Sequence, residues 1–332
     1  MSVLIITKSD DNESVSMVAD AIRERGGRAY RFDTDRFPTE LKLIHVHEKG
    51  SERVTVSGPE GDLDLNEVTA LWHRRLNVAG RLPASMDKQL RAASVGEARA
   101  SLYGLLASLK TFRMDRTPYL RHAENKQLQL RVADDIGLET PRTLITNDPD
   151  SVRGFMEACG GRIITKMLSS FAIYEDGMEK VVFTNPVTPS DLENLEDLRF
   201  CPMTFQEMVP KALELRVTIV GDQVFSASID SQSSDRATHD WRRDGLAMLD
   251  DWKEYELPEE VKARLLRLMD YFGLNYGAVD IIVTPEGRHV FLEINPAGEF
   301  FWLERVPGLP ISKAIADVLL GRSMRRARAL WE

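Results

Sequence analysis

The sequence predicts a mixed α/β fold, and three stretches carry this prediction. Residues 3–32 have the pattern of a strand, a helix and a second strand. Residues 213–229 and 276–295 each consist of two β-branched, apolar runs joined by a turn, which is typical of a β-hairpin. An amphipathic helix over residues 259–272 leads into the second hairpin.

Composition limits the class of protein. A chain of 332 residues is long enough for two or three domains, each with its own core. The formal net charge of −9 disfavours a general nucleic-acid binder. Cys159 and Cys201 lie far apart, which indicates neither a disulfide framework nor a zinc site and favours a reducing cytoplasm. No apolar stretch approaches transmembrane length, so we expect no membrane partner.

The first third of the chain predicts a nucleotide-binding-like opening without its usual phosphate loop. The helix over residues 12–25 ends at Gly26-Gly27, but the loop over residues 8–12 contains no glycine, which disfavours a Rossmann phosphate cradle. Further strands are expected at residues 41–56 and 68–74, and a long helix at residues 86–109 with a buried stripe of Leu102, Leu105, Leu106 and Leu109.

Arg74 and Arg75 end one of these strands. They could form salt bridges at a sheet edge or face an anionic ligand, and the sequence slightly favours the salt bridges.

The middle of the chain places a lysine at the end of an apolar strand. Residues 123–136 predict a helix that carries Lys126, and residues 162–166 predict a strand that ends in Lys166. Lysines in buried strands are rare unless an anion meets them. The extended run over residues 205–210 could present backbone groups to an adenine edge, or could be an ordinary connecting strand.

The first hairpin places Glu214 and Arg216 on one face, a pattern that usually means a cross-strand salt bridge. The polar residues 230–251 that follow predict an elaborated loop over the site. A final helix is expected at residues 311–320.

The second hairpin brings oxygen donors together. Strand alternation predicts one face with Val290, Leu292 and Ile294, and the other with Phe291, Glu293 and Asn295. Folding about Glu286 brings Asp280 across from the neighbourhood of Leu292 and Glu293. Adjacent carboxylates repel unless a proton or cation lies between them, and an all-oxygen donor set suits Mg²⁺. Solvated acids on a surface hairpin are the alternative for any one of these residues alone.

Taken in order over residues 123–321, these pieces resemble the ATP-grasp fold. The motifs are Lys126 on an early helix, the strand-end Lys166, a QEMVP hinge, ELRV, VD and LEINPAG. More narrowly, nearly the whole chain resembles the graspetide (omega-ester-containing peptide) maturases of the microviridin type. The stretches that carry this likeness are RFDTDRFP, ALWHRR, ENKQLQLRVADDIGLETPRTLITNDP, KMLSSFAIYEDG, VVFTNPV and IDSQ with a downstream HDWRR. The resemblance implies a pre-ATP-grasp domain over residues 1–116, a central subdomain over 117–205 and a C-terminal subdomain over 206–332.

The resemblance implies an ATP- and Mg²⁺-dependent macrocyclase that acts on a ribosomal precursor peptide with a leader and a core. A core Asp or Glu carboxylate would attack the γ-phosphate of ATP. A Ser or Thr hydroxyl, or a Lys amine, would then displace phosphate from the acyl phosphate and close an ester or amide ring. The family also suggests a homodimer.

The resemblance assigns roles to ten residues. Lys126 and Lys166 would neutralise the α- and β-phosphates, Glu207 with the Met208 and Val209 backbone would hold adenine, and Glu214 would lie near the ribose or the edge of the site. Arg216 would stabilise the transferring phosphoryl group, and Asp280, Glu293 and Asn295 would bind Mg²⁺.

Some assignments stay open. The loop over residues 167–177 is not glycine-rich, and Ser169 and Ser170 could serve as phosphate donors instead. Asp230, His239 and Asp240 are candidates for the base by location only. Trp241 and Trp252 could contact the leader, or pack in the core. A ligase that adds an amino acid to a peptide or protein, and a silent nucleotide-binding regulator, are the alternative functions. The intact set of Arg216 and the three metal candidates argues against the regulator.

Overall fold

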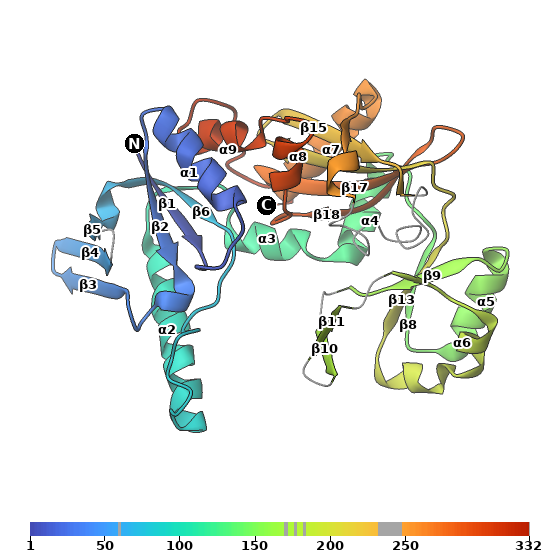
Figure 1. The fold of residues 1–332 in the computed structure, drawn as a ribbon, viewed down its shortest axis with the longest axis horizontal. Coiled ribbons are helices and arrows are strands. Elements are labelled where there is room, and N and C mark those ends of the chain that lie inside the picture. Colours follow the sequence, from blue (N-terminus) through green and yellow to red (C-terminus); the bar gives the residue numbers. More distant parts are fainter. Residues whose placement is uncertain (59–60, 169–171, 176–177, 182–183, 232–247, 332) are drawn as a thin grey trace.

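The computed structural model of the protein describes residues 1–331 except 59–60, 169–171, 176–177, 182–183 and 232–247. The N-terminal domain lies at the left of Figure 1, a small central subdomain at the lower right, and a larger sheet with its helices above and between them. In the described part of the chain, no helix is long and apolar enough to cross a membrane.

The N-terminal domain is built on a parallel sheet with the order β2-β1-β6-β7. Its elements are β1 (Ser2–Thr7), α1 (Ser14–Glu24), β2 (Arg28–Asp33), β6 (Val68–His73) and β7 (Phe112–Arg113). The predicted β-α-β opening is therefore confirmed. The apolar residues at helical spacing in α1 are buried, and the helix ends before Gly26, whose φ of 73° is a left-handed value that glycine adopts without strain.

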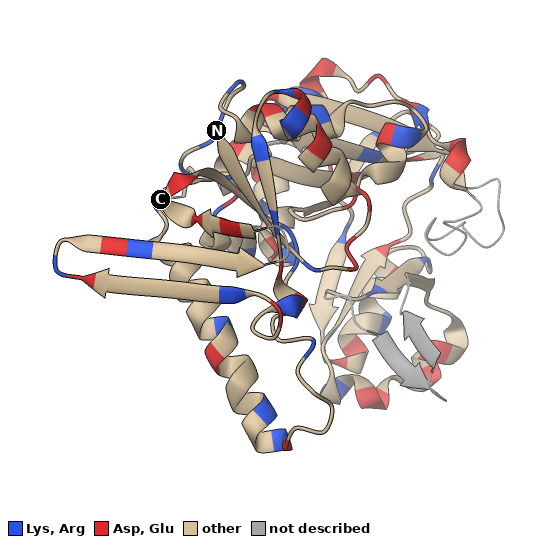
Figure 2. Cartoon of the chain, turned by 60° about the vertical axis from the view of Figure 1, so that its left-hand side comes forward, with Lys and Arg blue, Asp and Glu red and all other residues tan. Residues whose placement is uncertain are grey.

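Two extensions project from this sheet. One is an antiparallel sheet of β3 (Lys42–Glu48), β4 (Ser51–Gly58) and β5 (Gly61–Asp64), whose long β3–β4 hairpin stands out from the body in Figure 2. The other is α2 (Lys88–Ser108). The predicted apolar stripe of this helix is confirmed, because Leu102, Leu105 and Leu109 are buried and Leu106 packs against the same core.

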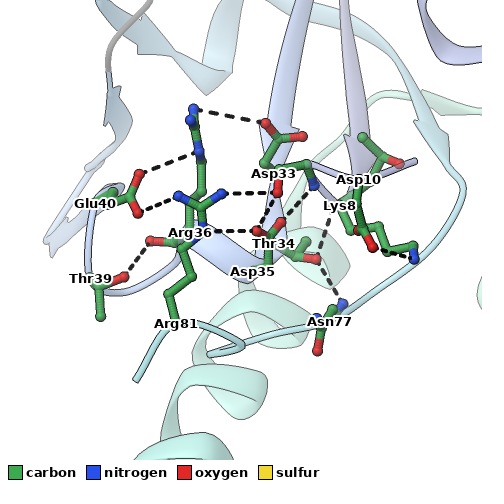
Figure 3. A network of polar contacts seen from close by, with 12 residues as sticks. Lys8, Asp10, Asp33, Thr34, Asp35, Arg36, Thr39, Glu40, Asn77 and Arg81 are labelled. Atoms are coloured by element: carbon green, nitrogen blue, oxygen red, sulfur yellow. Dashed lines mark hydrogen bonds and ion pairs between the residues drawn. The ribbon is translucent and has the colours of Figure 1, made fainter. Parts of the chain in front are cut away.

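The loop after β1 uses its polar groups within the domain. Both the N–H and the hydroxyl of Ser9 donate to the Asp35 carboxylate, at 2.7 and 2.6 Å. Arg81 Nε donates to the same carboxylate at 3.1 Å, and Figure 3 shows Asp35 and Arg81 within this network. Burial alone would raise the pKa of Asp35, but the hydrogen bonds from Ser9 and Arg81 leave it lowered. The loop thus holds the domain together, and the Ser9 N–H is not available to a phosphate.

The central subdomain has an antiparallel sheet of short strands in the order β12-β9-β13-β8. Its elements are β8 (Thr143–Thr146), α5 (Pro149–Ala158), β9 (Ile163–Lys166), β12 (Asn185–Pro186), α6 (Pro189–Glu193) and β13 (Met203–Glu207). The hairpin of β10 (Ala172–Glu175) and β11 (Met178–Val181) extends from it. A small core of Val152, Ile163, Val187, Leu198 and Phe205 holds this subdomain together.

The C-terminal sheet has the order β16-β15-β14-β17-β18. Its strands are β14 (Leu213–Val220), β15 (Gln223–Ile229), β16 (Lys253–Glu254), β17 (Tyr276–Val283) and β18 (His289–Asn295), and its helices are α7 (Glu259–Phe272), α8 (Phe301–Arg305) and α9 (Ile311–Leu319). Both predicted hairpins are confirmed. Helix α7 packs in one core with the sheet, while α9 packs with α1 and β1 in another, so the N-terminal domain and the C-terminal sheet share a core.

The helix expected over residues 123–136 is confirmed as α4 (Lys126–Asp135), which begins three residues later than expected. A separate short helix, α3 (Thr117–Ala123), precedes it. Asn125 between them is extended, and its side-chain Nδ2 donates to the carbonyls of Arg121 and His122 at the end of α3. Lys126 therefore begins a helix rather than lying inside one.

The domain limits need one adjustment. Strand β13 continues through Gln206 and Glu207, which pair with β9, so a division between residues 205 and 206 would cut a strand. The residues of α3 and α4 pack in the core of the C-terminal sheet. We propose a boundary after Glu207, with α3 and α4 belonging in space to the C-terminal subdomain.

Candidate active site

One cavity of about 770 Å³ lies where the three parts of the chain meet. The central subdomain contributes Ile164, Lys166 and residues 206–210 to its wall. The C-terminal sheet contributes Glu214, Arg216, Asp280, Glu293 and Asn295, the start of α4 contributes Lys126, and the N-terminal domain contributes Arg75. All ten residues to which the family resemblance assigned roles line this cavity.

The hairpin of β17 and β18 brings the oxygen donors together with one irregularity. Asp280 pairs with Glu293, which lies within the neighbourhood expected for it, but Ile281 pairs with Phe291, so Leu292 is an extra residue in β18. This β-bulge interrupts the alternation of side chains. The predicted faces are therefore wrong at these positions: Phe291 is fully buried in the core, and Leu292 lines the cavity beside Glu293.

The two carboxylates and the amide form a connected cluster. The Asn295 amide Nδ2 donates to Asp280 Oδ2 at 3.2 Å and to Glu293 Oε1 at 3.0 Å. The ammonium of Lys126 lies 3.2 Å from Glu293 Oε2 and donates to Asn295 Oδ1, also at 3.2 Å. Burial alone would raise the pKa of Glu293. The charges of Lys126 and Lys166, with the hydrogen bonds from Asn295 and Lys126, lower it to about 2. Glu293 is thus held ionised, ready to bind a cation.

The chemistry of this donor set fits Mg²⁺. Rotation of the Asn295 side-chain amide by half a turn would present Oδ1 to the space between the carboxylates, which supplies three hard oxygen donors. Across the described ranges, no group of three His, Cys, Asp or Glu side chains gathers to hold a metal. An ion bound here would complete its shell with waters and phosphate oxygens, as Mg²⁺ commonly does.

Arg216 faces this cluster from the neighbouring strand. It pairs with Asp280 across β14 and β17, and its Nη1 lies 3.0 Å from Asp280 Oδ1. Its guanidinium also lies over the Trp302 ring, 5.7 Å from the centroid. The buried Nε has no hydrogen-bond partner among the described residues, and Nη1 meets Asp280 as an ion pair without a well-formed hydrogen bond. Since unsatisfied buried donors are costly, this arrangement fits an anion that accepts from Arg216 during function.

The salt bridge suggested by the pattern of Glu214 and Arg216 does not form. The two residues lie on the same strand, and each pairs elsewhere. Glu214 accepts from Lys211 Nζ at 2.6 Å, while Arg216 pairs with Asp280. Lys211 follows the hinge directly and lies three residues before Glu214, a spacing that could have identified it in the sequence.

The hinge has fewer free backbone N–H groups for a ligand than its sequence suggests. The N–H groups of Glu207 and Met208 donate to the carbonyls of Arg142 and Arg162, each at 3.0 Å. The Glu207 carboxylate accepts from the Arg142 N–H, also at 3.0 Å. The Met208 N–H is therefore engaged within the protein in this conformation. The Val209 N–H has no hydrogen-bond partner among the described residues, so it can donate a hydrogen bond to a ligand.

Other candidates fall into two groups. Ser169, Ser170, His239, Asp240 and Trp241 lie outside the described residues. Asp230 is exposed at the end of β15. Trp252 is buried in the core, 6.1 Å from Trp302 between ring centroids, which supports its packing role.

Comparisons with known proteins agree with this geometry. A family model described as the MvdD pre-ATP grasp domain matches residues 2–121. The macrocyclase MdnC of Microcystis aeruginosa, solved with its precursor peptide MdnA, is 50% identical, with a TM-score of 0.87 over 97% of this chain and 100% of that chain. A RiPP-associated ATP-grasp ligase of Chryseobacterium gregarium, solved with ADP and a leader and core peptide, is 39% identical, with a TM-score of 0.94 over 99% of each chain.

A more distant relative is a probable alpha-L-glutamate ligase of Shewanella loihica. It is 24% identical over 213 residues, which is 63% of this chain and 67% of that protein. The identity and coverage of the two solved structures are both far higher. The chain belongs to the family of ATP-grasp macrocyclases that act on ribosomally synthesised peptides.

Proposed function

We propose that the protein uses ATP to close rings between side chains of a ribosomal precursor peptide. The observation that carries this proposal is the full-length likeness to MdnC bound to its precursor peptide, at 50% identity. The cavity supplies the matching chemistry, because a hinge, several cations and an acid-acid-amide cluster line one space. An ADP-forming ligase needs these parts to hold a nucleotide and transfer its terminal phosphoryl group.

In the proposed first step, a side-chain carboxylate oxygen of a peptide Asp or Glu attacks the γ-phosphorus of ATP. The bond from that phosphorus to the bridging oxygen breaks, which releases ADP and leaves an acyl phosphate. Arg216 donates to the transferring phosphoryl oxygens through Nε and Nη1. Fixed donors of this kind stabilise charge that develops in the transition state.

In the second step, a Ser or Thr hydroxyl or a Lys amine attacks the acyl carbon, and phosphate leaves with closure of the ester or amide. Asp280, Glu293 and Asn295 would hold Mg²⁺, which when bound neutralises charge on the phosphate chain. Lys166 faces the phosphates from β9, and Lys126 would move from Glu293 toward them. Val209 N–H and Glu207 hold the adenine, and Glu214 with Lys211 lies at the ribose end.

The test is mass spectrometry of the peptide MdnA after incubation with the protein, ATP and Mg²⁺. We expect the peptide to lose one water for each ring. The Glu293→Ala variant should yield no dehydrated product, while the matched Glu260→Ala variant should retain it, because Glu260 is an exposed helix residue. A peptide that gains the mass of an added amino acid would support the glutamate-ligase alternative. Undiminished dehydration by Glu293→Ala would overturn the metal assignment.

Two further properties belong to this proposal. We place the enzyme in the cytoplasm as a homodimer. Both described cysteines are free, as a reducing compartment favours. Light scattering at several protein concentrations tests the oligomeric state.

A further inference from the structure

Arg74 and Arg75 follow β6 at the carboxyl edge of the parallel sheet, and the two side chains have different environments. The Arg74 side chain is only 2% exposed and lies over the Trp72 ring at 5.2 Å. The Arg75 side chain is 41% exposed and lines the active-site cavity. The first residue is part of the domain structure, whereas the second presents a positive charge to the cavity.

Glu299 is the acid that both arginines share. It follows the metal candidates on the loop after β18, and its carboxylate accepts from Arg74 Nη2 at 2.9 Å and from Arg75. It also accepts from the Asn12 amide and, at 3.3 Å, from the Ser14 hydroxyl. The charge of Glu299 is therefore balanced by Arg74 and two neutral donors even without Arg75.

The second acid near Arg75 is also satisfied elsewhere. Asp11 Oδ1 lies 3.8 Å from Arg75 Nη1, which is beyond hydrogen-bonding distance. The Asp11 carboxylate accepts from the Thr7 hydroxyl and, at 2.9 Å, from the Asn12 N–H. An incoming carboxylate could therefore take up donors of Arg75 without leaving a buried internal acid unpaired.

The cations on the opposite side of the cavity from Arg75 each contact an acid of the site. Lys126 contacts Glu293, Lys211 contacts Glu214, and Arg216 contacts Asp280. These three come from the α4 and β14 side of the cavity, while Arg75 enters from the N-terminal domain. Figure 1 places that domain on the side of the molecule away from the central subdomain, which carries the hinge. Arg75 therefore lies on the wall where a second substrate can meet the phosphoryl end of a nucleotide.

We propose that Arg75 binds the side-chain carboxylate of the peptide Asp or Glu that becomes phosphorylated. This inference rests on the proposed function. The carboxylate must approach an anionic triphosphate, so a guanidinium on its far side offsets the repulsion. The planar guanidinium also matches a carboxylate with two parallel hydrogen bonds, which fixes one oxygen for attack on phosphorus. In this arrangement Arg216 binds the phosphoryl group, and Arg75 binds the peptide carboxylate that accepts it.

The experiment is a double-mutant cycle between enzyme and peptide. Wild-type and Arg75→Gln proteins are compared for affinity toward the precursor peptide and toward the same peptide with its ring-forming Asp and Glu residues changed to Asn and Gln. AMPPNP and Mg²⁺ are present in every measurement. We expect the wild type to prefer the acidic peptide by roughly 10- to 100-fold, a typical effect of charged hydrogen bonds. Arg75→Gln should show almost no preference.

Two controls separate binding from domain structure. Glu299→Gln breaks the same ion pair but keeps the guanidinium, so its preference for the acidic peptide should persist. Arg75→Lys keeps the charge but loses the two parallel hydrogen bonds of the guanidinium, so it should give an intermediate preference. This variant also provides the comparison if Arg75→Gln fails to fold. AMPPNP affinity should change less than about two-fold, because the nucleotide contacts are untouched.

Equal preference for the acidic peptide in wild type and Arg75→Gln would overturn the inference, as would a loss of that preference in Glu299→Gln. The first readout is independent of the proposed function. If wild-type protein with ATP never dehydrates the peptide, the proposed function fails. If it dehydrates the peptide but the cycle shows no coupling, only the role of Arg75 fails.

Discussion

Glu293→Gln allows the electrostatics of the acid cluster to be tested without any substrate. The pKa of Glu293 falls from its ordinary 4.5 to about 2 in the folded protein. Each pKa unit corresponds to about 1.4 kcal/mol, so ionised Glu293 contributes about 3 kcal/mol to folding at neutral pH. Glutamine mimics the protonated acid, and the variant should therefore be less stable by about that amount at pH 7.

The sign of the pH dependence follows from the lowered pKa. A carboxyl whose pKa is lower in the folded state contributes its full stability above its unfolded pKa and loses it as the pH falls through the folded pKa. The window is therefore about pH 4.5 to about 2 for Glu293. At pH 3 the difference between wild type and Glu293→Gln should shrink to about 1 kcal/mol.

The assay is the free energy of unfolding in urea, measured without metal at pH 7, 5 and 3. Glu260→Gln is the matched control, since its side chain is 72% exposed and its ion pair with Arg264 is 3.6 Å long. Such surface pairs contribute at most about 1 kcal/mol. If Glu293→Gln is as stable as wild type at pH 7, or its deficit is the same at pH 7 and pH 3, the described balance of charges is wrong.

Two further substitutions test the surrounding structure. Arg216→Lys should lower turnover by about 100-fold while AMPPNP affinity stays nearly constant, because a lysine cannot reproduce both guanidinium donors; equal losses in binding and turnover would contradict the role given to Arg216. Gly277→Ala should destabilise the protein by about 1–3 kcal/mol, because the added Cβ would lie 2.6 Å from Ile294 Cδ1 and 2.9 Å from Met269 Sδ. The control Gly154→Ala has no atom within 4 Å of the added Cβ and should raise the melting temperature; a stable Gly277→Ala protein would show that the core can adjust.

Local patterns predicted much of the fold because each element carries its own signal. Alternation and a turn were enough to place Asp280 near Leu292 and Glu293, and the structure pairs it with Glu293. The bulge at Leu292 has no such signal, since one extra residue is set by how β18 packs against the core. The start of α4 did have a signal, because Asn directly before a helical run is a preferred N-cap residue. Asn125 holds that position, although its side chain donates to the end of α3 rather than capping α4.

The parts of the site that were not predicted depend on residues far apart in the chain. Glu299 meets Arg74 and Arg75 across more than 200 positions. Neither the spacing nor the composition of either segment indicates that contact. The sequence showed that the arginines could face an anion or form salt bridges, and the structure shows ion pairs with Glu299 and a place for Arg75 in the cavity wall.

The central claim is that Asp280, Glu293 and Asn295 hold a divalent cation against the phosphates of ATP. A crystal structure with AMPPNP and Mn²⁺, which gives an anomalous signal, tests it directly. The account predicts one anomalous peak within about 2.0–2.4 Å of oxygen atoms from these side chains and from the β- and γ-phosphates. A nucleotide whose phosphates lie away from β17 and β18, or a metal bound without Glu293, would contradict it.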